Sequence, residues 1–351
     1  MLLDGKIVLV TGGTGSMGKT LVNRLLRGEM GKPKKVIVFS RDEAKQHDMR
    51  LAVQRRSLST DEIIYRNFMQ VLEFRIGDVR DYAAVCSAVR RADIVINAAA
   101  LKQVPSCEYF PAEAVLTNCI GACNIVRAIE ENAYPVQTVV AISTDKACKP
   151  VNVMGMTKSL QERIFVAANI LNPATRFIGV RYGNVLASRG SVIPLFHEQI
   201  ARGGPVTLTS PKMTRFLLSL DHAVDTVFAG LKGARAGEIY VPRAPSAIVT
   251  NIAKALIGKR KIPIKITGVR PGEKLHEIMV SEEEIHHCVR RGDYYVIRSM
   301  LPELGGDRRE ANALKAEYSS GDSVMSYTAT ATLLRKHGLM VAETAAEELL
   351  R

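Results

Sequence analysis

The chain begins with a glycine-rich turn that lies directly between a short apolar strand and a helix. The β-branched run Lys6–Val10 is followed by Thr11-Gly12-Gly13-Thr14-Gly15-Ser16-Met17-Gly18. Glycines at this spacing permit a tight turn, close approach of the backbone to a pyrophosphate, and close packing of helix on strand. This placement predicts a dinucleotide-binding βαβ unit, with a glycine-rich turn that binds nothing as the alternative.

Short apolar runs alternate with helical patterns through the first half of the chain. The predicted strands are Lys6–Val10, Val36–Phe39, Glu73–Ile76, Ile94–Asn97, Val139–Ile142, Arg176–Arg181 and Glu238–Val241. The helical patterns include Thr20–Arg27, Asp81–Arg90, Ala112–Glu130 and Met154–Ala168. Such alternation predicts an α/β protein with a Rossmann-type, doubly wound parallel sheet that is covered by helices on both faces.

The regular alternation ends near Arg181, and turn signals become frequent beyond it. We expect a dinucleotide-binding domain over residues 1–185 and a smaller mixed α/β substrate domain over residues 186–300. The strand near 238–242 is expected to return to the main sheet. Residues 301–351 form a C-terminal segment to which the sequence assigns no role.

Composition narrows the classes of partner. The formal net charge is +13, which fits either a basic solvated surface or a field that attracts a dinucleotide and a nucleotide sugar. Tryptophan is absent, aromatic residues are 5% of the chain, and lysines and arginines are scattered, so a nucleic-acid partner is not expected.

The six cysteines form no Cys-x-x-Cys pair, and no signal peptide and no stretch of about 20 apolar residues is present. We therefore predict a cytoplasmic protein without a membrane span. No metal is expected either, because the adjacent His286 and His287 are awkward ligands on a helix.

The end of the second strand bears on the choice of dinucleotide. It reads Phe39-Ser40-Arg41-Asp42. NAD-preferring enzymes usually have a carboxylate at the strand end, which holds the ribose 2′-hydroxyl. Ser40 and Arg41 instead suit a 2′-phosphate. We predict NADP, with NAD as the alternative because Asp42 follows.

Further cofactor contacts are expected where the third and fourth strands end, since ligands bind beyond the carboxyl ends of parallel strands. Asp78, which follows the third strand, could instead cap a helix. The full predicted set is Gly12, Thr14, Gly15, Ser16, Met17, Gly18, Ser40, Arg41, Asp78, Val79, Ala98, Ala99, Ala100 and Lys158.

Several longer motifs recur together with the glycine loop. They are Gly77-Asp78-Val79-Arg80-Asp81, Ala98-Ala99-Ala100-Leu101-Lys102-Gln103-Val104-Pro105-Ser106-Cys107-Glu108, Ser143-Thr144-Asp145-Lys146, Arg181-Tyr182-Gly183-Asn184-Val185-Leu186-Ala187-Ser188-Arg189-Gly190 and Arg270-Pro271-Gly272-Glu273-Lys274. This set resembles the UDP-N-acetylglucosamine 4,6-dehydratases of flagellin-sugar and capsule synthesis, which are extended short-chain dehydrogenases of the polysaccharide-biosynthesis type. The resemblance covers about residues 4–285 and leaves Arg55–Phe68 and the tail beyond about 300 unmatched.

Met154 stands where many short-chain dehydrogenases have a tyrosine. A tyrosine four residues before Lys158 would share its helix face, and the lysine would lower the phenol's pKa so that it could accept a proton. A thioether cannot do this. The family that the chain resembles has a Met branch, which includes enzymes that also invert C5, and we count Met154 among the substrate contacts.

The resemblance implies a reaction in which C4 is oxidised, water is lost across C5 and C6, and hydride returns to C6. We assign Lys146 to removal of the C5 proton, Asp145 to protonation of the C6 hydroxyl, Thr144 to the C4 oxygen and Lys158 to the nicotinamide ribose. Burial would raise the pKa of Asp145 and lower that of Lys146 as required, whereas their mutual attraction would act in the opposite sense.

Two questions about this pair stay open. The group that takes the C4 hydroxyl proton is Asp145, directly or through water, or else Tyr182 or a water chain. An exposed ion pair in a strand-end turn is the non-catalytic alternative for Asp145 and Lys146.

Substrate contacts are expected from residues that match the family's motifs. Arginine suits a diphosphate because its planar fork donates in pairs, although each arginine here could equally form a surface ion pair. Glu273 could accept from a ribose hydroxyl. The predicted set is Lys102, Met154, Asn184, Arg189, Arg215, Arg270 and Glu273.

Three functions therefore compete. The leading one is a UDP-N-acetylglucosamine 4,6-dehydratase with C5 inversion that acts in surface polysaccharide or glycan synthesis. A UDP-sugar 4-epimerase shares the first step, and a non-catalytic NADP-binding protein is the alternative from another class. The resemblance also implies a homo-oligomer, a dimer or a hexamer.

Overall fold

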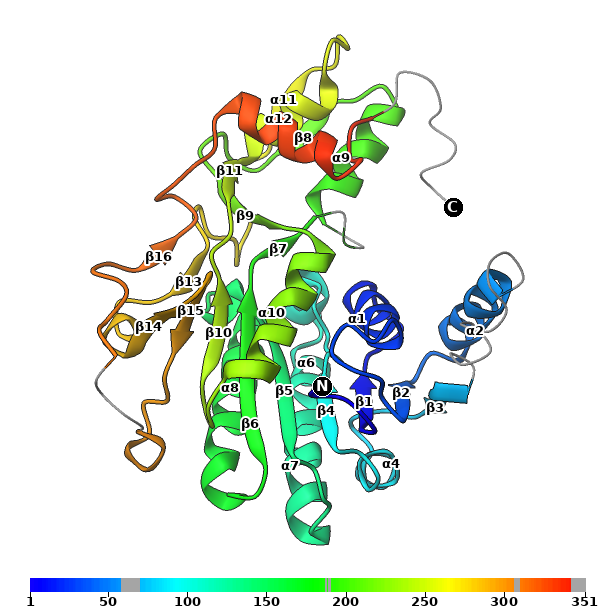
Figure 1. Cartoon of the computed structure of the whole chain (residues 1–351). Coiled ribbons are helices and arrows are strands. Elements are labelled where there is room, and N and C mark those ends of the chain that lie inside the picture. Colours follow the sequence, from blue (N-terminus) through cyan, green and yellow to red (C-terminus); the bar gives the residue numbers. More distant parts are fainter. Residues whose placement is uncertain (58–69, 187, 189–190, 306–309, 342–351) are drawn as a thin grey trace.

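The computed structural model describes residues 1–57, 70–186, 188, 191–305 and 310–341 (Figure 1). Within them, one large sheet has the order β14-β15-β10-β6-β5-β4-β1-β2-β3. Its strands are β1 (Ile7–Thr11), β2 (Lys35–Ser40), β3 (Leu72–Ile76), β4 (Ile94–Asn97), β5 (Thr138–Thr144), β6 (Arg176–Tyr182), β10 (Ile239–Pro242), β14 (Cys288–Arg291) and β15 (Tyr294–Ile297). The strands from β3 to β10 are parallel, and the predicted doubly wound sheet is confirmed.

Every strand expected from the sequence is present, and β10 pairs with β6 in the main sheet. The sheet also takes up β15 and β14, which pair antiparallel beyond β10 and come from the region assigned to the substrate domain. These strands form a hairpin around Gly292, whose φ is 59°. Strand β14 ends in two arginines and lacks the continuous apolar run that marks a central strand, whereas β15 is a Tyr-Tyr-Val-Ile run that was not predicted as a strand.

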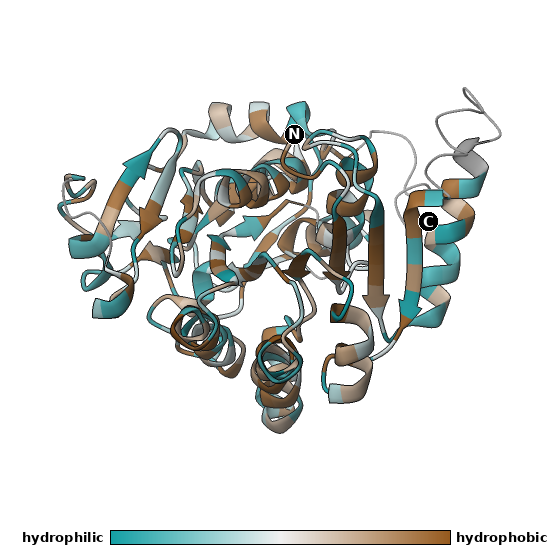
Figure 2. Ribbon diagram, turned by 60° about the horizontal axis from the view of Figure 1, so that its bottom comes forward, coloured by the Kyte–Doolittle hydropathy of each residue, from teal (hydrophilic) through white to brown (hydrophobic). Residues whose placement is uncertain are grey.

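Helices cover both faces of the sheet. The main ones are α1 (Ser16–Leu26), α2 (Glu43–Ser57), α4 (Tyr82–Val89), α7 (Gly121–Asn132), α8 (Val153–Leu171) and α10 (Leu220–Gly233). Alternate strand residues face opposite ways, so Val8 and Val10 pack with α1 and α10 while Leu9 packs with α4 and α7. Figure 2 shows these apolar strands between the helix layers.

Helix α7 continues a longer helical run that starts with α6 (Pro111–Val115) and a π-helical turn, η1 (Leu116–Ile120). The whole run, Pro111–Asn132, is long and apolar enough to cross a membrane, yet 56% of its most apolar window is buried inside the fold. It packs between α4 and α8. We therefore interpret it as a core helix.

A second core lies beyond the carboxyl ends of the main strands. It is built from β7 (Asn184–Val185), β8 (Val206–Leu208), β9 (Thr214–Leu218), β11 (Ser246–Ile248), β12 (Ile264–Ile266), α9 (Val192–Ala201), α11 (Val249–Ile257) and α12 (Tyr327–Lys336). Helix α12 packs on α11 and buries Ala331 and Leu334. The C-terminal segment, to which the sequence assigned no role, thus completes this core.

Arg181, on β6, ties the main sheet to the segment that runs through Met279 and Glu284. Its side chain is 2% exposed and donates to Glu162 on α8 and to Glu284 in the turn η3 (Glu284–His287). It also donates to the carbonyl oxygen of Met279 in β13 (Ile278–Val280), at 2.8 Å. Strand β13 pairs with β16 (Tyr318–Ser319). Because a buried charge without partners is costly, these bonds fix where β13 meets β6 and α8.

Candidate active site

The glycine loop between β1 and α1 leaves room for a dinucleotide. Gly12 has a φ of 65°, and a Cβ there would lie 2.7 Å from the backbone nitrogen of Ala99. A Cβ on Gly18 would lie 2.6 Å from the carbonyl oxygen of Gly12. Helix α1 begins at Ser16 without a side-chain cap, so its first backbone N–H groups are free to bind a phosphate.

At the end of β2, Ser40 and Asp42 make contacts within the protein, whereas Arg41 is exposed and can meet a ligand. The Ser40 hydroxyl is buried and contacts Thr14 and Gln46. Asp42 accepts from the backbone of Lys45 and so turns toward the start of α2. Arg41 is 62% exposed and lies 3.7 Å from Asp78. Of these residues, Arg41 has the charge and the exposure to meet a 2′-phosphate.

After β3, Asp78 is not the helix cap that the sequence offered as an alternative role. Asp78 pairs with Arg80, and Asp81 is the cap of α4. Burial would raise the pKa of Asp78, but its bonds with Arg80 outweigh burial and hold the pKa below the ordinary value. Val79 is buried against Gly121, so only its backbone can face a ligand.

A buried asparagine shapes the loop after β4. Asn118, in the π-helical turn, donates to the carbonyl of Leu101 and accepts from its N–H group. It also donates to Thr157 on α8. These bonds hold Leu101, which directly follows Ala98–Ala100, near α8, while Lys102 is exposed on the same loop.

Lys158 lies inside α8, with 5% of its surface exposed. It donates to the carbonyl of Ile142 at 2.6 Å and to the side chain of Gln161. Desolvation lowers the pKa of Lys158 to about 8. The lysine is thus held at the end of β5, where a nicotinamide ribose is expected.

Met154 does not stand free beside Lys158. It is 5% exposed and packs with Cys107, Ala114 and Leu101 in a small apolar cluster. Its side chain therefore fills space between α8 and the α5 segment (Val104–Tyr109). The expected substrate contact of Met154 stays a prediction, and its observed role is packing.

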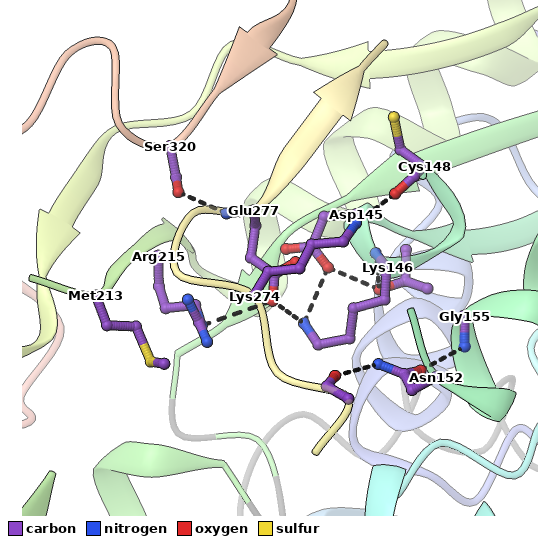
Figure 3. Close-up of polar contacts among 12 residues, drawn as sticks. Asp145, Lys146, Cys148, Asn152, Gly155, Met213, Arg215, Lys274, Glu277 and Ser320 are labelled. Carbon is purple, nitrogen blue, oxygen red and sulfur yellow. Dashed lines mark hydrogen bonds and ion pairs between the residues drawn. The ribbon is translucent and has the colours of Figure 1, made fainter. Parts of the chain in front are cut away.

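Asp145 and Lys146, the acid and base predicted from the sequence, lie in a short turn, η2 (Asp145–Ala147), that follows β5. Asp145 is fully buried, which argues against an exposed ion pair. Lys146 contacts Asp145 at 3.1 Å and a second carboxylate, Glu277, also at 3.1 Å (Figure 3). The Thr144 hydroxyl donates to Asp145 at 2.9 Å.

Glu277 was not among the residues predicted from the sequence. It is 2% exposed and lies next to β13, far along the chain from the Asp145-Lys146 motif. The only sequence signal for it is its position three residues after Lys274, at the end of a motif that was recognised. Arg215 on β9 approaches Glu277 to 3.6 Å, and Lys274 donates to the carbonyl of Cys148 at 2.5 Å.

These groups set each other's protonation. Burial raises the pKa of Asp145, and the charge of Glu277 adds to this, so that attraction to Lys146 is outweighed. Burial would lower the pKa of Lys146, but the two carboxylates outweigh it and raise the value. The pKa of Asp145 is therefore shifted in the direction expected for an acid, whereas the pKa of Lys146 is raised, opposite to the direction expected for a base. Burial also raises the pKa of Tyr182, which keeps its phenol neutral.

Several buried acceptor atoms here lack a hydrogen-bond partner among the described residues. They are Asp145 Oδ2, Asn184 Oδ1, Glu273 Oε2 and Glu277 Oε2. Such atoms are costly unless a ligand or water supplies a donor. Three of them belong to residues assigned to catalysis or substrate binding from the sequence.

The remaining predicted substrate residues are spread around this cluster. Arg215 is brought to Glu277, while Arg270 is exposed at the start of the loop that carries Glu273 and Lys274. Arg189 lies outside the described residues. Among the parts of the chain that the structure describes, no three His, Cys, Asp or Glu side chains gather as metal ligands.

Two glycines allow the site to form. A Cβ on Gly155 would lie 2.2 Å from the carbonyl oxygen of Lys146, so only glycine lets α8 approach the η2 turn this closely. A Cβ on Gly183 would lie 2.6 Å from Phe216 and 3.3 Å from Asp145 Oδ2. Gly155 lies between Met154 and Lys158 in the sequence, which alone gives no sign of this close contact.

The parallel sheet, the phosphate loop and the Lys158 helix together define an extended short-chain dehydrogenase. Residues 8–299 match the family described as "Polysaccharide biosynthesis protein", and the chain belongs to this family. The expected family is thereby confirmed.

The curated relatives include two kinds of enzyme. "UDP-N-acetylglucosamine 4,6-dehydratase (inverting)" of Campylobacter jejuni is 44% identical over 299 residues, which are 84% of each chain. "UDP-glucose 4-epimerase" of Rickettsia bellii is 43% identical over 302 residues, 85% of this chain and 84% of that one.

Among solved structures, Pen from Bacillus thuringiensis has a TM-score of 0.85 and 33% identity, and covers 97% of this chain and 100% of that one. DesIV, a dTDP-glucose 4,6-dehydratase from Streptomyces venezuelae, has a TM-score of 0.64 and 21% identity, and covers 77% of this chain and 86% of that one. At this identity, DesIV supports the fold alone.

We predict that Gly155→Ala disrupts the site. Alanine normally favours a helix interior by about 0.5–1 kcal/mol, but here its methyl group must displace the Lys146 carbonyl. Turnover should fall at least about tenfold, because η2 carries the proposed acid and base. The matched control is Gly230→Ala in α10, where the nearest contact is a side-chain atom at 3.3 Å. Equal turnover for both variants, measured with urea unfolding, would contradict this account.

Proposed function

We propose that this chain is a UDP-N-acetylglucosamine 4,6-dehydratase that also inverts C5 and makes a UDP-4-keto-6-deoxy-N-acetylhexosamine for surface polysaccharide or glycan synthesis. The observation that carries the proposal is the buried Asp145 beside Lys146 at the carboxyl end of β5. The identity with the Campylobacter jejuni enzyme adds support.

The proposed chemistry uses a nicotinamide cofactor that, when bound, accepts the C4 hydride and returns it to C6. Asp145 takes the C4 hydroxyl proton and later gives it to the C6 hydroxyl, which leaves as water. Lys146 removes the C5 proton, which the C4 ketone has made acidic. Thr144, proposed to bind the C4 oxygen, also orients Asp145 by donating to it, and Lys158 holds the ribose.

The substrate fits the charge of the site. Asp145 and Glu277 lie among three cations, Lys146, Arg215 and Lys274, which can attract an anionic ligand. Arg215 is proposed to bind the diphosphate, and the unpaired Glu273 Oε2 and Asn184 Oδ1 are proposed to accept from ribose or sugar hydroxyls.

A UDP-sugar 4-epimerase is the second candidate, because the Rickettsia relatives carry that name. An epimerase returns hydride to C4 and needs no acid for the C6 hydroxyl. Met154 also removes the tyrosine that would serve as its base. These features favour the dehydratase.

We predict that the chain, incubated with UDP-N-acetylglucosamine and NADP⁺ and followed by NMR, gives a new C6 methyl signal. A UDP-N-acetylgalactosamine product would instead establish an epimerase. Asp145→Asn and Lys146→Ala should each lower dehydration about 10²–10⁴-fold, the usual contribution of a general acid or base. Both variants should retain cofactor binding, and near-normal turnover in both would refute the assignment.

We propose NADP as the cofactor, supported by the exposed Arg41 and by the engagement of Asp42 with Lys45. In fluorescence titrations NADPH should bind more tightly than NADH. Arg41→Ala should weaken NADPH about tenfold and leave NADH nearly unchanged, because it removes one charge-assisted contact. Tighter binding of NADH to the unaltered protein would refute this proposal.

We also propose a homo-oligomer, a dimer or a hexamer, in which a second copy covers an apolar face. Met156 and Leu160, both 52% exposed, are one turn apart on α8, and Val115, Leu116 and Ile120 are exposed on the adjoining helical run. Isolated apolar residues at a surface are common, but a continuous stripe marks an interface.

Light scattering should therefore give a mass that is a multiple of 38.5 kDa. Leu160→Glu should shift the protein toward monomer. Ile266→Glu, at a 49% exposed position on β12, is the matched control and should not. A monomer for the unaltered chain would refute the proposal.

We also propose a cytoplasmic location. All six cysteines are free, which supports a location in the reducing cytoplasm.

A further inference from the structure

The proposed reaction requires an acceptor for one more proton than Asp145 and Lys146 can hold between them. Lys146 can remove the C5 proton only when it is neutral, yet it lies between two carboxylates that keep it charged. Before it can act, its own proton must therefore move to a neighbouring group.

Asp145 could receive that proton across 3.1 Å, but then it could not also take the proton of the C4 hydroxyl. Tyr182 is no substitute, because burial keeps its phenol neutral. Two protons need two acceptors. Among the described residues, the other carboxylate in contact with Lys146 Nζ is Glu277.

Glu277 is built to serve as this acceptor. Its backbone N–H donates to Ser320, which fixes its position, and its carboxylate is 2% exposed. Oε1 faces Lys146, while Oε2 has no hydrogen-bond partner among the described residues and can hold a hydrogen. Figure 3 shows Lys146 between Asp145 and Glu277, with Arg215 approaching Glu277.

We propose that Glu277 is the proton acceptor that frees Lys146, so that the Nζ proton moves to Glu277 while Asp145 takes the C4 hydroxyl proton. This inference rests on the proposed dehydratase reaction. Glu277 acts through Lys146 and is therefore a positioning and relay residue.

The proton count closes only with this third group. The substrate loses its C4 hydroxyl proton to Asp145 and its C5 proton to Lys146. Asp145 then protonates the leaving C6 hydroxyl. Inversion requires that C5 regain a proton on the face opposite Lys146, so a water molecule supplies that proton, and the hydroxide left behind takes the stored proton of Glu277. Asp145 and Glu277 end as carboxylates and Lys146 as an ammonium, which is the resting state.

Arg215 couples this relay to the substrate. In the resting structure its guanidinium lies 3.6 Å from Glu277 and helps to keep that carboxylate charged. A bound diphosphate competes for Arg215 and leaves Glu277 with a higher proton affinity. The other charged groups around the relay are Asp145 from η2 and Lys274 from the loop before β13.

The first test measures the charge of Lys146 without requiring turnover. Acetic anhydride labelling of Lys146, which is 19% exposed, is followed by mass spectrometry across a pH series. Glu277→Gln should move the midpoint down by at least about one pH unit, because one stabilising carboxylate is lost. Glu317→Gln, which removes the partner of Lys149, is the control and should leave the midpoint unchanged. An unchanged midpoint in Glu277→Gln overturns the inference.

The second test follows the reaction with UDP-N-acetylglucosamine and NADP⁺. Glu277→Gln should still accumulate reduced cofactor, while kcat for dehydration falls about 10²-fold or more and KM changes little. Its kcat should recover about tenfold per pH unit at alkaline pH, as hydroxide replaces the missing acceptor. Glu277→Asp should restore part of the activity at neutral pH.

Activity of Glu277→Gln within twofold of the unaltered enzyme, or a loss that alkaline pH does not recover in a variant that still binds NADPH, overturns the relay. If the unaltered chain converts no UDP-N-acetylglucosamine, the proposed function fails. The labelling experiment then still decides whether Glu277 sets the charge of Lys146.

Discussion

The buried Arg181 is the interaction on which the geometry of the candidate site depends. It joins β6, through its own backbone, to Glu162 on α8 and to Glu284 and Met279 beside β13. Helix α8 carries Lys158, and β13 begins directly after Glu277. One guanidinium thus holds in place both the proposed cofactor lysine and the second carboxylate. Removing it would leave two buried carboxylates without their cation, a far larger penalty than the loss of a surface ion pair.

Burial and attraction compete at the end of β5. Desolvation decides the protonation of Asp145, because two carboxylates share one ammonium and cannot both be fully compensated. Attraction decides the protonation of Lys146 for the same reason. The raised pKa of Asp145 suits its proposed role of taking and returning a proton, whereas Lys146, the proposed base, stays charged until a partner receives its proton. Met154, buried among Cys107 and Ala114, takes no part in this competition.

Most of the fold follows from local sequence patterns. The run Thr11–Gly18 and the apolar strands are local signals, since glycine spacing and hydrophobic alternation report directly on backbone geometry. In the β14–β15 hairpin the two arginines of β14 hide the pattern of a strand, whereas the Tyr-Tyr-Val-Ile run of β15 is a local signal that the prediction did not use. The sequence allows Asp78 to be either a cofactor contact or a helix cap, and in the structure Asp81 caps the helix. Residue Arg189 lies outside the described residues, so its predicted role is still a prediction.

The sequence by itself determined the family, the dinucleotide loop and the Asp145-Lys146 motif, because each is carried by neighbours along the chain. Only the tertiary structure decided that Glu277 meets Lys146, that Met154 is buried, and that Gly155 must lack a side chain. Each of these facts depends on a contact between segments that are distant in sequence and meet only when α8 and β13 have packed beside the sheet. Periodicity and spacing carry no information about such contacts, whereas the charge of a buried lysine depends on them entirely.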